Sequence, residues 1–405
     1  MNKVCVIGGG AAGLIAAIVS ARNGNEVYLY EKNQILGKKL LITGKGRCNV
    51  TNKCELNTFL DNIVTNKKFL YSAFSSFTSN DVIDFFESLG VSLKVERGNR
   101  VFPTSDKSSD IVSSLVCELK NVGVKVINQA VISLESHDGK ICGIVTNEKK
   151  ESFDKVIVAT GGISYPKTGS TGDGYKFAKS QNHTVTKLLP SLVPLVVYDD
   201  FCESLMGLSL RNVKITLYQN ETAIFEDFGE MLFTHFGISG PIILSASAHI
   251  NFEHNNKFYL DIDLKPALNE QKLDARILRD FEENKNKEIL HVLPKLLPTS
   301  LVKIMLARCS ISQITKVNNI TKEQRLLLIK NIKAFRLSIK CARPIDEAII
   351  TRGGVDVSKI NPRTMESTLV SGLFFAGEVL DLDAYTGGFN LQIAFSTGYL
   401  AANNL

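Results

Sequence analysis

The sequence contains no pair of cysteines with the C-x-x-C spacing that many zinc and redox sites use. Its eight cysteines are scattered over 405 residues, and no cluster of histidines accompanies them. We therefore expect no metal site. A chain of this length does not depend on disulfides for its stability, so the cysteines are predicted to be free thiols in a reducing, cytoplasmic environment.

Long apolar segments are nearly absent as well. Only residues 4–21 approach the roughly 18 apolar residues that a membrane-spanning helix needs. Four glycines interrupt this segment and no small-residue cleavage site follows it, so it is not typical of a span or of a signal peptide. A buried strand, turn and helix explain the segment better, and we expect no contact with a membrane.

Charge is distributed unevenly along the chain. The net charge is +6, whereas residues 265–343 contain 17 Lys and Arg against 7 Asp and Glu, a net charge of +10. Such a segment is typical of amphipathic helices with solvated lysines, and it also fits an anionic partner. Its aromatic residues, Phe281 and Phe335, do not alternate with its cations, so nucleic acid is a less favoured partner than a small molecule.

The first 31 residues have the pattern of a β-α-β unit. Strands are expected at 3–7 and 26–31, and a helix at 11–23. The turn between the first strand and the helix carries the motif G-x-G-x-x-G. In this context the motif predicts a dinucleotide-binding site.

Each glycine of such a motif has a distinct physical role. Gly8 permits the tight turn, Gly10 lets backbone N–H groups approach a pyrophosphate, and Gly13 lets the helix lie close to the sheet. Glu31 ends the second strand 18 residues after Gly13. A carboxylate at this point accepts hydrogen bonds from the ribose hydroxyls of an adenosine.

Later segments favour FAD over NAD as the dinucleotide. The apolar strand 155–159 suits the middle of a parallel sheet and ends in a glycine turn at 160–162. Residues 373–378 form a second strand that ends at a glycine and an acid, and the glycine pair within 387–392 opens the last helix. Bare N–H groups at a helix start suit the edge of a flavin ring, where negative charge accumulates on reduction.

These patterns predict one discontinuous nucleotide-binding domain with an insertion. The FAD-binding domain is expected at 1–190 and 344–405, an antiparallel β domain at 191–265, and a helical subdomain at 266–343. No second glycine motif is followed by a strand and an acid, so a dedicated NAD(P) domain is not expected. Either NAD(P)H docks transiently at the flavin, or the substrate itself reduces the flavin.

With these segments the chain resembles the glutathione-reductase type of FAD domain. More closely, it resembles a bacterial flavoprotein family that includes aminoacetone oxidases and a bile-acid enone (3-dehydro-bile-acid) reductase. The resemblance is carried by five strings: GKKLLITGKGRCNVTN (37–52), RVFPTSDKSSD (100–110), the ATGG and YPKTGSTGDGY region (159–175), GEMLFTHFGISGP (229–241) and TMESTLVSGLFFAGEVLDLDAYTGGFNLQIAFSTG (364–398).

The resemblance implies an α/β fold: a Rossmann-like FAD domain, an inserted β-barrel-like domain and a small helical domain. It also implies a set of FAD contacts, in which Val131 would meet the adenine through its backbone and Glu378 would hold the ribityl chain. Asp381 and Asp383 are alternatives to Glu378. The full set is Gly8, Gly10, Ala12, Gly13, Glu31, Lys32, Arg47, Cys48, Asn49, Val131, Thr160, Gly161, Gly377, Glu378, Gly388, Asn390 and Leu391.

Three residues are candidates for catalysis: Cys48, His235 and Tyr385. Cys48 and Cys54 have C-x5-C spacing, which differs from the C-x4-C pair of disulfide reductases, so Cys48 is interpreted as a flavin neighbour or a small buried thiol. His235, in the family string on the insertion, is either a proton donor or substrate ligand, or structural. Tyr165, Lys45 and Arg47 are further polar candidates near the flavin.

The sequence therefore predicts an FAD-dependent oxidoreductase that acts on a small metabolite by hydride transfer to or from flavin N5. Reduction of an enone by NAD(P)H is favoured. Oxidation of an amine by O2 is the alternative within the enzymes. An RNA-associated flavoprotein and a flavin-bound sensor without turnover are the remaining readings, and monomer and homodimer both stay open.

Overall fold

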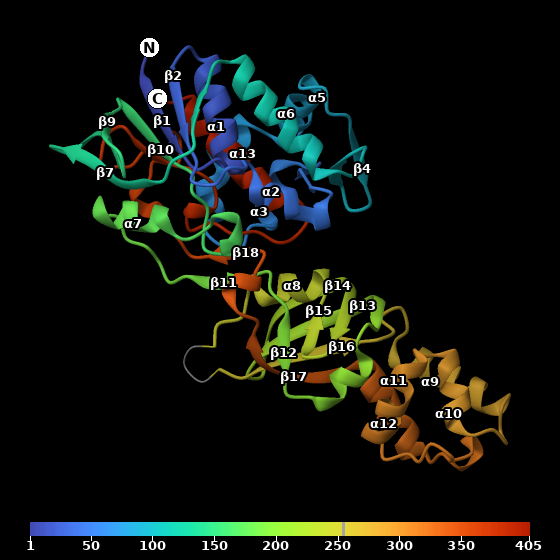
Figure 1. Ribbon diagram of the computed structural model, residues 1–405. Helices are drawn as coiled ribbons and strands as arrows, with labels where there is room; N and C mark the ends of the chain where they lie inside the picture. The colour runs from blue at the N-terminus through green and yellow to red at the C-terminus, as the bar shows by residue number, and fades with distance from the viewer. Residues whose placement is uncertain (253–255) are drawn as a thin grey trace. The chain divides into compact units, whose positions relative to one another are not determined.

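The computed structural model describes residues 1–252 and 256–405. The chain divides into two compact units (Figure 1). The first contains residues 1–191 and 344–405, and the second contains residues 192–343. The sequence expectation placed the junctions at 190/191 and 343/344, next to these boundaries.

The first unit is built on a five-stranded parallel sheet. Its strand order is β19-β10-β1-β2-β6, and every neighbouring pair is parallel. The strands are β1 (Lys3–Ile7), β2 (Glu26–Tyr30), β6 (Lys125–Ile127), β10 (Lys155–Val158) and β19 (Leu373–Phe375). The core residues of β1, β10 and β19 are buried, as expected for strands covered on both faces. The predicted α/β fold with a Rossmann-type sheet is confirmed.

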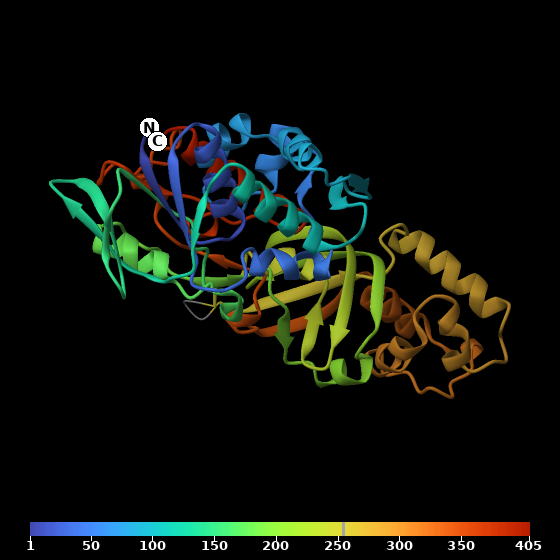
Figure 2. The same cartoon turned by 45° about the horizontal axis from the view of Figure 1, so that its top comes forward.

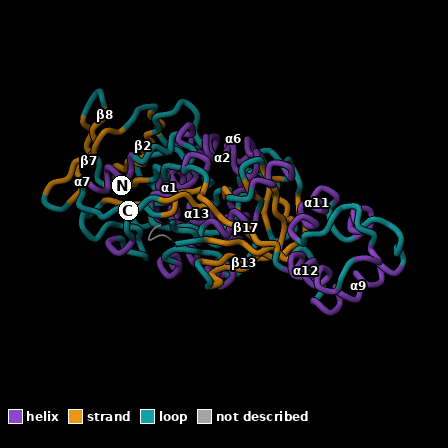
Figure 3. Tube along the Cα trace, turned by 90° about the horizontal axis from the view of Figure 1, so that it is seen from below, coloured by secondary structure: helices purple, strands orange, loops and turns teal. Residues whose placement is uncertain are grey.

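The two ends of the chain meet in a helix pair. Helix α1 (Ala11–Arg22) packs against α13 (Phe389–Ala402), and both are apolar and mostly buried. Figure 1 and Figure 3 both place these helices side by side. A Cβ on Gly398 would lie 2.4 Å from the carbonyl oxygen of Ala12, so only glycine allows the helices to approach this closely. The last helix therefore supports the first glycine loop directly.

Smaller elements surround the sheet. Two three-stranded sheets have the orders β3-β5-β4 and β7-β8-β9, and β11 pairs with β18. Their bounds are β3 (Thr51–Asn52), β4 (Leu93–Glu96), β5 (Arg100–Pro103), β7 (Val131–His137), β8 (Lys140–Thr146), β9 (Lys150–Ser152), β11 (Leu189–Ser191) and β18 (Ile350–Arg352). The helices are α2 (Lys38–Ile42), α3 (Leu56–Asp61), α4 (Tyr71–Ser76), α5 (Ser79–Ser88), α6 (Ser108–Asn121) and α7 (Asp173–Ser180).

The second unit contains a closed six-stranded barrel. Its order is β12-β15-β14-β13-β16-β17, and its strands pair antiparallel. The elements are β12 (Leu195–Val197), β13 (Ser209–Gln219), β14 (Thr222–Thr234), β15 (Gly237–Ser239), β16 (Phe258–Asp263) and β17 (Phe335–Ala342), with α8 (Pro241–Ser247) beside β14. The predicted barrel-like insertion is confirmed.

Strand β17 lies within the segment 266–343 that the sequence analysis expected to be helical. Phe335, Leu337 and Ile339 are buried, whereas the residues between them are more exposed. This alternation is the period of a strand with one face in a core. The helices therefore end at Lys333, and the chain returns to the barrel to pair with β16 and β12.

Four helices separate β16 from β17: α9 (Glu270–Glu282), α10 (Ile289–Val292), α11 (Thr299–Arg308) and α12 (Lys322–Lys333). Figure 2 shows them in orange beside the yellow-green barrel strands of the same unit. Their buried residues belong to one core with the barrel. Among the described residues, no helix combines the length and the apolar character required to cross a bilayer.

Candidate functional site

The first glycine loop is shaped by close packing. Gly8 has φ +107°, and a Cβ there would lie 2.5 Å from the carbonyl oxygen of Ala159. A Cβ on Gly13 would lie 1.8 Å from the carbonyl oxygen of Gly8. Both positions therefore require glycine for the protein's own fold. They bring the end of β1, the end of β10 and the start of α1 together.

Gly10 differs from its two neighbours in the motif. A Cβ built on it would meet no atom of the described residues within 4 Å. Its backbone is extended, with φ −88° and ψ −167°, which other residues also adopt. No side chain caps α1 and no acid lies in its first turn, so the first N–H groups and the positive end of the helix dipole stay available to an anion. Ala12 lies in this turn.

Glu31 is held beside the same loop at the end of β2. One carboxylate oxygen accepts a hydrogen bond from the N–H of Gly9 (2.7 Å), and the other accepts one from the N–H of Asn33 (2.8 Å). The carboxylate is therefore fixed in orientation while it remains half-buried. Its neighbour Lys32 is exposed, and its ammonium pairs with Asp173 at 2.6 Å.

A polar network surrounds Glu378 at the end of β19. Its Oε2 is 2.6 Å from Nζ of Lys39, and its Oε1 accepts hydrogen bonds from the N–H of Thr351 (2.9 Å) and from Oγ of Ser164 (3.0 Å). A Cβ on Gly162 would lie 2.3 Å from Oγ1 of Thr351, so this glycine leaves room for the network. Glu378 is thereby fixed next to the second glycine turn.

The sequence analysis did not identify Lys39, Ser164 or Thr351. Lys39 lies in the string GKKLLITG, one of the five on which the family resemblance rests. That string indicated that the segment matters to the family. It could not indicate which residue pairs with Lys39, because Lys39 and Glu378 are 339 positions apart in the sequence.

The third glycine segment joins the last helix to the strand β3. Gly388 has φ +101°, and a Cβ there would lie 2.4 Å from the carbonyl carbon of Thr51. Asn390 uses its side chain to shape the preceding loop: it accepts from the N–H of Ala384 (3.0 Å) and donates to the carbonyl of the same residue (2.8 Å). Leu391 follows in the first turn and is half-buried. The start of α13 is thus fixed near the end of the loop that carries Cys48.

Gly377 connects this segment to the first loop. It has φ +77°, its N–H donates to Oγ1 of Thr397 (2.9 Å), and a Cβ there would lie 2.8 Å from Cβ of Ala12. The ends of β1, β10 and β19 therefore converge on the first turn of α1. The predicted cofactor-binding residues at the ends of these three strands therefore lie at one edge of the sheet.

Cys48 is completely buried in a left-handed turn, with φ +58°. Burial raises the pKa of its thiol to about 11, and burial also raises the pKa of Cys54 to about 11. Both are free thiols in the structure. Because the thiolate is the reactive form, neither environment favours a nucleophilic or redox-active cysteine at neutral pH.

Three buried oxygens near the predicted contacts lack hydrogen-bond partners. They are Oδ1 of Asn49, Oγ1 of Thr160 and Oε1 of Gln129, none of which meets a donor or acceptor in residues 1–252 or 256–405. Gln129 lies two residues before Val131, which opens β7. Buried polar atoms are normally paired. These unpaired oxygens and the free space at Gly10 fit a bound dinucleotide that completes the site.

The other predicted residues lie in different surroundings. The Arg47 guanidinium pairs with Glu96 and Asp106, each at 2.5 Å, on the β4–β5 side of the unit. Tyr385 is half-buried in the loop before the glycine pair, and its N–H donates to the carbonyl of Asn62 (3.0 Å). His235 is exposed at the turn between β14 and β15 in the second unit.

The two alternatives to Glu378 differ in exposure: Asp383 is completely buried and Asp381 is half-buried. Burial raises the pKa of Asp381 and of Asp383 above the usual range of a carboxyl group. Oδ2 of Asp383 accepts a hydrogen bond from Oγ of Ser191 (3.1 Å), so this side chain is engaged with the last residue of β11.

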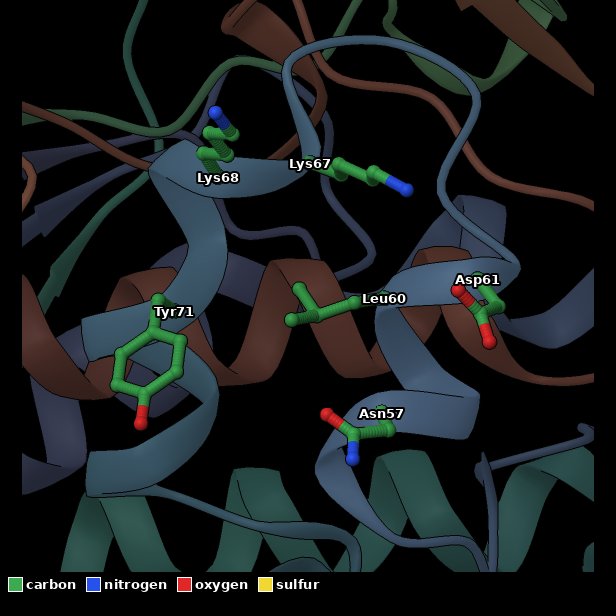
Figure 4. Close-up of a pocket in the computed structure, with 6 residues that line it drawn as sticks. All are labelled: Asn57, Leu60, Asp61, Lys67, Lys68 and Tyr71. Atoms are coloured by element: carbon green, nitrogen blue, oxygen red, sulfur yellow. The ribbon is translucent and has the colours of Figure 1, made fainter.

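A surface hollow in the first unit lies on α3, α4 and the turn between them (Figure 4). It is lined by Asn57, Leu60, Asp61, Lys67, Lys68 and Tyr71. None of the predicted cofactor or catalytic residues lines it. In the described ranges no group of His, Cys, Asp and Glu is arranged to hold a metal ion.

Known proteins resemble this chain along its whole length. The 3-dehydro-bile acid delta(4,6)-reductase of Clostridium scindens is 30% identical over 405 residues, which cover 99% of this chain and 98% of that protein. The ribosomal RNA dihydrouridine synthase of Haemophilus influenzae is 32% identical over 403 residues, which cover 98% of this chain and 96% of that protein. Both relatives therefore span the two units.

A solved structure shares the fold. The 3-ketosteroid-delta4-(5alpha)-dehydrogenase of Rhodococcus jostii RHA1 superposes with a TM-score of 0.52 at 14% identity, covering 99% of this chain and 96% of that one. The HI0933-like protein Rossmann domain matches residues 2–404. The chain belongs to this HI0933-like family of Rossmann-domain proteins, and it is an FAD-dependent oxidoreductase.

Proposed function

We propose that the protein reduces a carbon–carbon double bond conjugated to a carbonyl group, with NAD(P)H as the electron donor. One observation carries the proposed double-bond reduction: the names of two full-length relatives, with different substrates, both describe a product with hydrogen added across a carbon–carbon double bond. A delta-4 bond next to a 3-oxo group is an enone. Dihydrouridine is uridine with two hydrogens added across C5=C6, a double bond conjugated to the C4 carbonyl.

The reaction balances without a further reagent. A hydride adds to the carbon β to the carbonyl, a proton adds to the α carbon, and NAD(P)H becomes NAD(P)+. Bound FAD would supply the hydride-transferring ring. The protein must therefore bind that cofactor, exclude water from it, and deliver one proton.

The residues of the first unit account for cofactor binding. The open first turn of α1 at Gly10 would bind the pyrophosphate, and Glu31 would accept from the adenosine ribose. Thr160 and Asn49 would direct their unpaired oxygens toward the cofactor. Glu378, which Lys39, Thr351 and Ser164 hold in place, retains a lone pair on Oε2 for a ribityl hydroxyl.

We assign the proton to Tyr385. It is half-buried and lies two residues before Gly387, the first glycine of the pair that opens α13. Cys48 is completely buried, which keeps it from touching a substrate, and we assign it to the packing beneath the cofactor.

Reduction of the purified holoenzyme under anaerobic conditions tests the proposal. NADH or NADPH should bleach the flavin band, and a 4-en-3-one steroid or a uridine-containing RNA should restore it while gaining two hydrogens by mass spectrometry. Bleaching by aminoacetone alone, with recovery on admission of O2, would instead establish the amine oxidase reading.

A uracil base within RNA is the second candidate substrate. The net charge of +10 on residues 265–343 favours this candidate, because a positively charged segment attracts a polyanion such as RNA. Binding of a small molecule does not require such a charge. The two candidates predict the same flavin chemistry and differ only in which oxidised substrate restores the band.

A further inference from the structure

Gln129 has a buried side-chain oxygen that no protein group uses. The residue lies two positions after the end of β6 and is half-buried. Its Oε1 is shielded from solvent and meets no hydrogen-bond partner in residues 1–252 or 256–405. Buried polar atoms are normally paired, so this oxygen is suited to a donor from outside the chain.

Hydrogen bonds between β2 and β6 show where Gln129 lies. The two strands run parallel, with Tyr30 opposite Ile127. Beyond this pair the N–H of Glu31 donates to the carbonyl of Ile127 (3.0 Å), and Nδ2 of Asn128 donates to the carbonyl of Glu31 (3.0 Å). Gln129 therefore directly follows a residue that is bonded to the acid assigned to the adenosine ribose.

Two other amide side chains at these strand ends are used by the fold itself. Nδ2 of Asn128 also donates to the carbonyl of Asn33 (2.6 Å). Nδ2 of Asn33 in turn donates to Oε1 of Glu31 (2.7 Å) and to the carbonyl of Thr168 (3.2 Å). Both amides hold the turn that carries the acid. Oε1 of Gln129 takes no part in this network.

The order of the strands follows the order of the groups in the dinucleotide. β1 leads into the glycine loop proposed for the pyrophosphate, and β2 ends at Glu31, proposed for the ribose. β6 lies on the other side of β2 from β1, and it leads to Gln129. The adenine extends from the ribose away from the pyrophosphate. The strand that follows β2 in that direction is β6.

Adenine carries the donor that this oxygen lacks. Its 6-amino group donates hydrogen bonds, and a glutamine amide is complementary to that group and a neighbouring ring nitrogen. A ribose hydroxyl is the competing donor. For that hydroxyl the site already has Oε2 of Glu31, which accepts one hydrogen bond from the described residues, from the N–H of Gly9 (2.7 Å). The base is therefore the better partner for Gln129.

We propose that Gln129 accepts a hydrogen bond from the 6-amino group of the FAD adenine and thereby selects this base. The inference rests on the placement of the ribose at Glu31 in the proposed function, and it does not depend on which double bond is reduced. A dinucleotide whose base lacks the amino group leaves Oε1 of Gln129 buried and unpaired, which weakens its binding.

The test titrates the full-length apoprotein with FAD and with the analogue that carries purine, which has no 6-amino group, in place of adenine. Flavin fluorescence gives both Kd values without any turnover. The wild type should bind FAD about tenfold more tightly than the purine analogue, as expected for one hydrogen bond to a buried group. Gln129→Leu and the smaller Gln129→Ala remove the acceptor and should bring the two Kd values within about twofold of each other. Gln129→Glu keeps an acceptor and should keep the preference.

Gln181→Leu is the matched control. It makes the same exchange in the first unit, at a buried glutamine whose Oε1 accepts a hydrogen bond from Oγ of Ser136 (2.7 Å). This variant should lower the Tm of the apoprotein and still prefer FAD about tenfold over the purine analogue, since its amide already has a protein partner.

Equal binding of FAD and the purine analogue by the wild type would overturn the inference. So would a preference that survives in both Gln129→Leu and Gln129→Ala. The FAD analogue with 2′-deoxyadenosine tests the ribose: if these two variants abolish its penalty and keep that of purine, Gln129 contacts the ribose and the inference is wrong. Failure to reduce an enone or a uracil, with the base preference intact, would refute the proposed function alone.

Discussion

Gly10→Ala is the sharpest test of the cofactor site, because the structure separates the needs of the ligand from those of the fold. A methyl group at Gly10 meets no protein atom within 4 Å in the described residues, and the backbone there is accessible to alanine. The apoprotein should therefore keep its stability. The gain of up to about 1 kcal/mol from restricting the unfolded chain is offset by the poorer N-cap that alanine gives α1, so the Tm should stay within about 2–4 °C of the wild type.

Binding of FAD should respond in the opposite direction. The methyl group would occupy the space through which backbone N–H groups reach the pyrophosphate, so at least one charge-assisted hydrogen bond is lost. Such a bond contributes about 1.5–3 kcal/mol, and 1.4 kcal/mol is tenfold in Kd, so we expect FAD affinity to fall about 10- to 100-fold. Titration of apoprotein with FAD, followed by flavin fluorescence, measures the Kd.

Gly13→Ala is the matched control. Its Cβ would lie 1.8 Å from the carbonyl oxygen of Gly8, so it should destabilise the apoprotein by about 1–3 kcal/mol or more through overpacking. Thermal unfolding of the two apoproteins distinguishes the cases. If Gly10→Ala binds FAD within twofold of the wild type, or lowers the apoprotein Tm as Gly13→Ala does, the assignment of this space to a pyrophosphate is wrong.

Two other substitutions and one labelling experiment test separate parts of the site. Lys39→Met leaves the half-buried Glu378 carboxylate without its cation, so it should cost about 1–3 kcal/mol of stability and lower FAD affinity. Lys39→Arg should restore part of both, and equal effects of Met and Arg would contradict the pairing. Asn390→Ala removes both hydrogen bonds to Ala384 and should weaken FAD binding about tenfold by loosening the start of α13, whereas an unchanged Kd would show that the loop does not depend on it. Burial raises the pKa of the Cys48 thiol to about 11, so iodoacetamide at pH 8 should spare Cys48 in the native protein and modify the exposed Cys117, Cys142 and Cys341. Peptide mass spectrometry identifies the labelled cysteines, and rapid labelling of Cys48 would disprove its burial.

Much of the sheet was predictable because its signals are local. The β-α-β unit follows from apolar periodicity and glycine spacing within the first 31 residues, and the buried strand β10 follows from an uninterrupted apolar run. Strand β17 was missed because it follows a lysine-rich helix without a proline or glycine between them. Its alternation extends over only three buried side chains, which the surrounding helical pattern obscures.

The polar network of the site could not be predicted from the sequence. Glu378 was recognisable as an acid after a strand and a glycine, but its partners come from distant segments, Lys39 on α2 and Thr351 on β18. Nothing in the local pattern of either residue indicates a carboxylate partner. Such pairs exist only once the fold has brought the segments together, and periodicity carries no information about them.

The glycines show most clearly what structure adds to a motif. In the sequence, Gly8, Gly10 and Gly13 are equivalent letters of one pattern. In the fold, two of them are required by neighbouring backbone and Gly10 faces empty space. Gly10 leaves the half-buried first turn of α1 open to an approaching group, and the buried oxygens of Asn49 and Thr160 have no hydrogen-bond partner in the described residues, although buried polar atoms are normally paired. These features have one common explanation, which is that the fold is completed by a ligand with an anionic group for the helix start and hydrogen-bonding groups for the two oxygens.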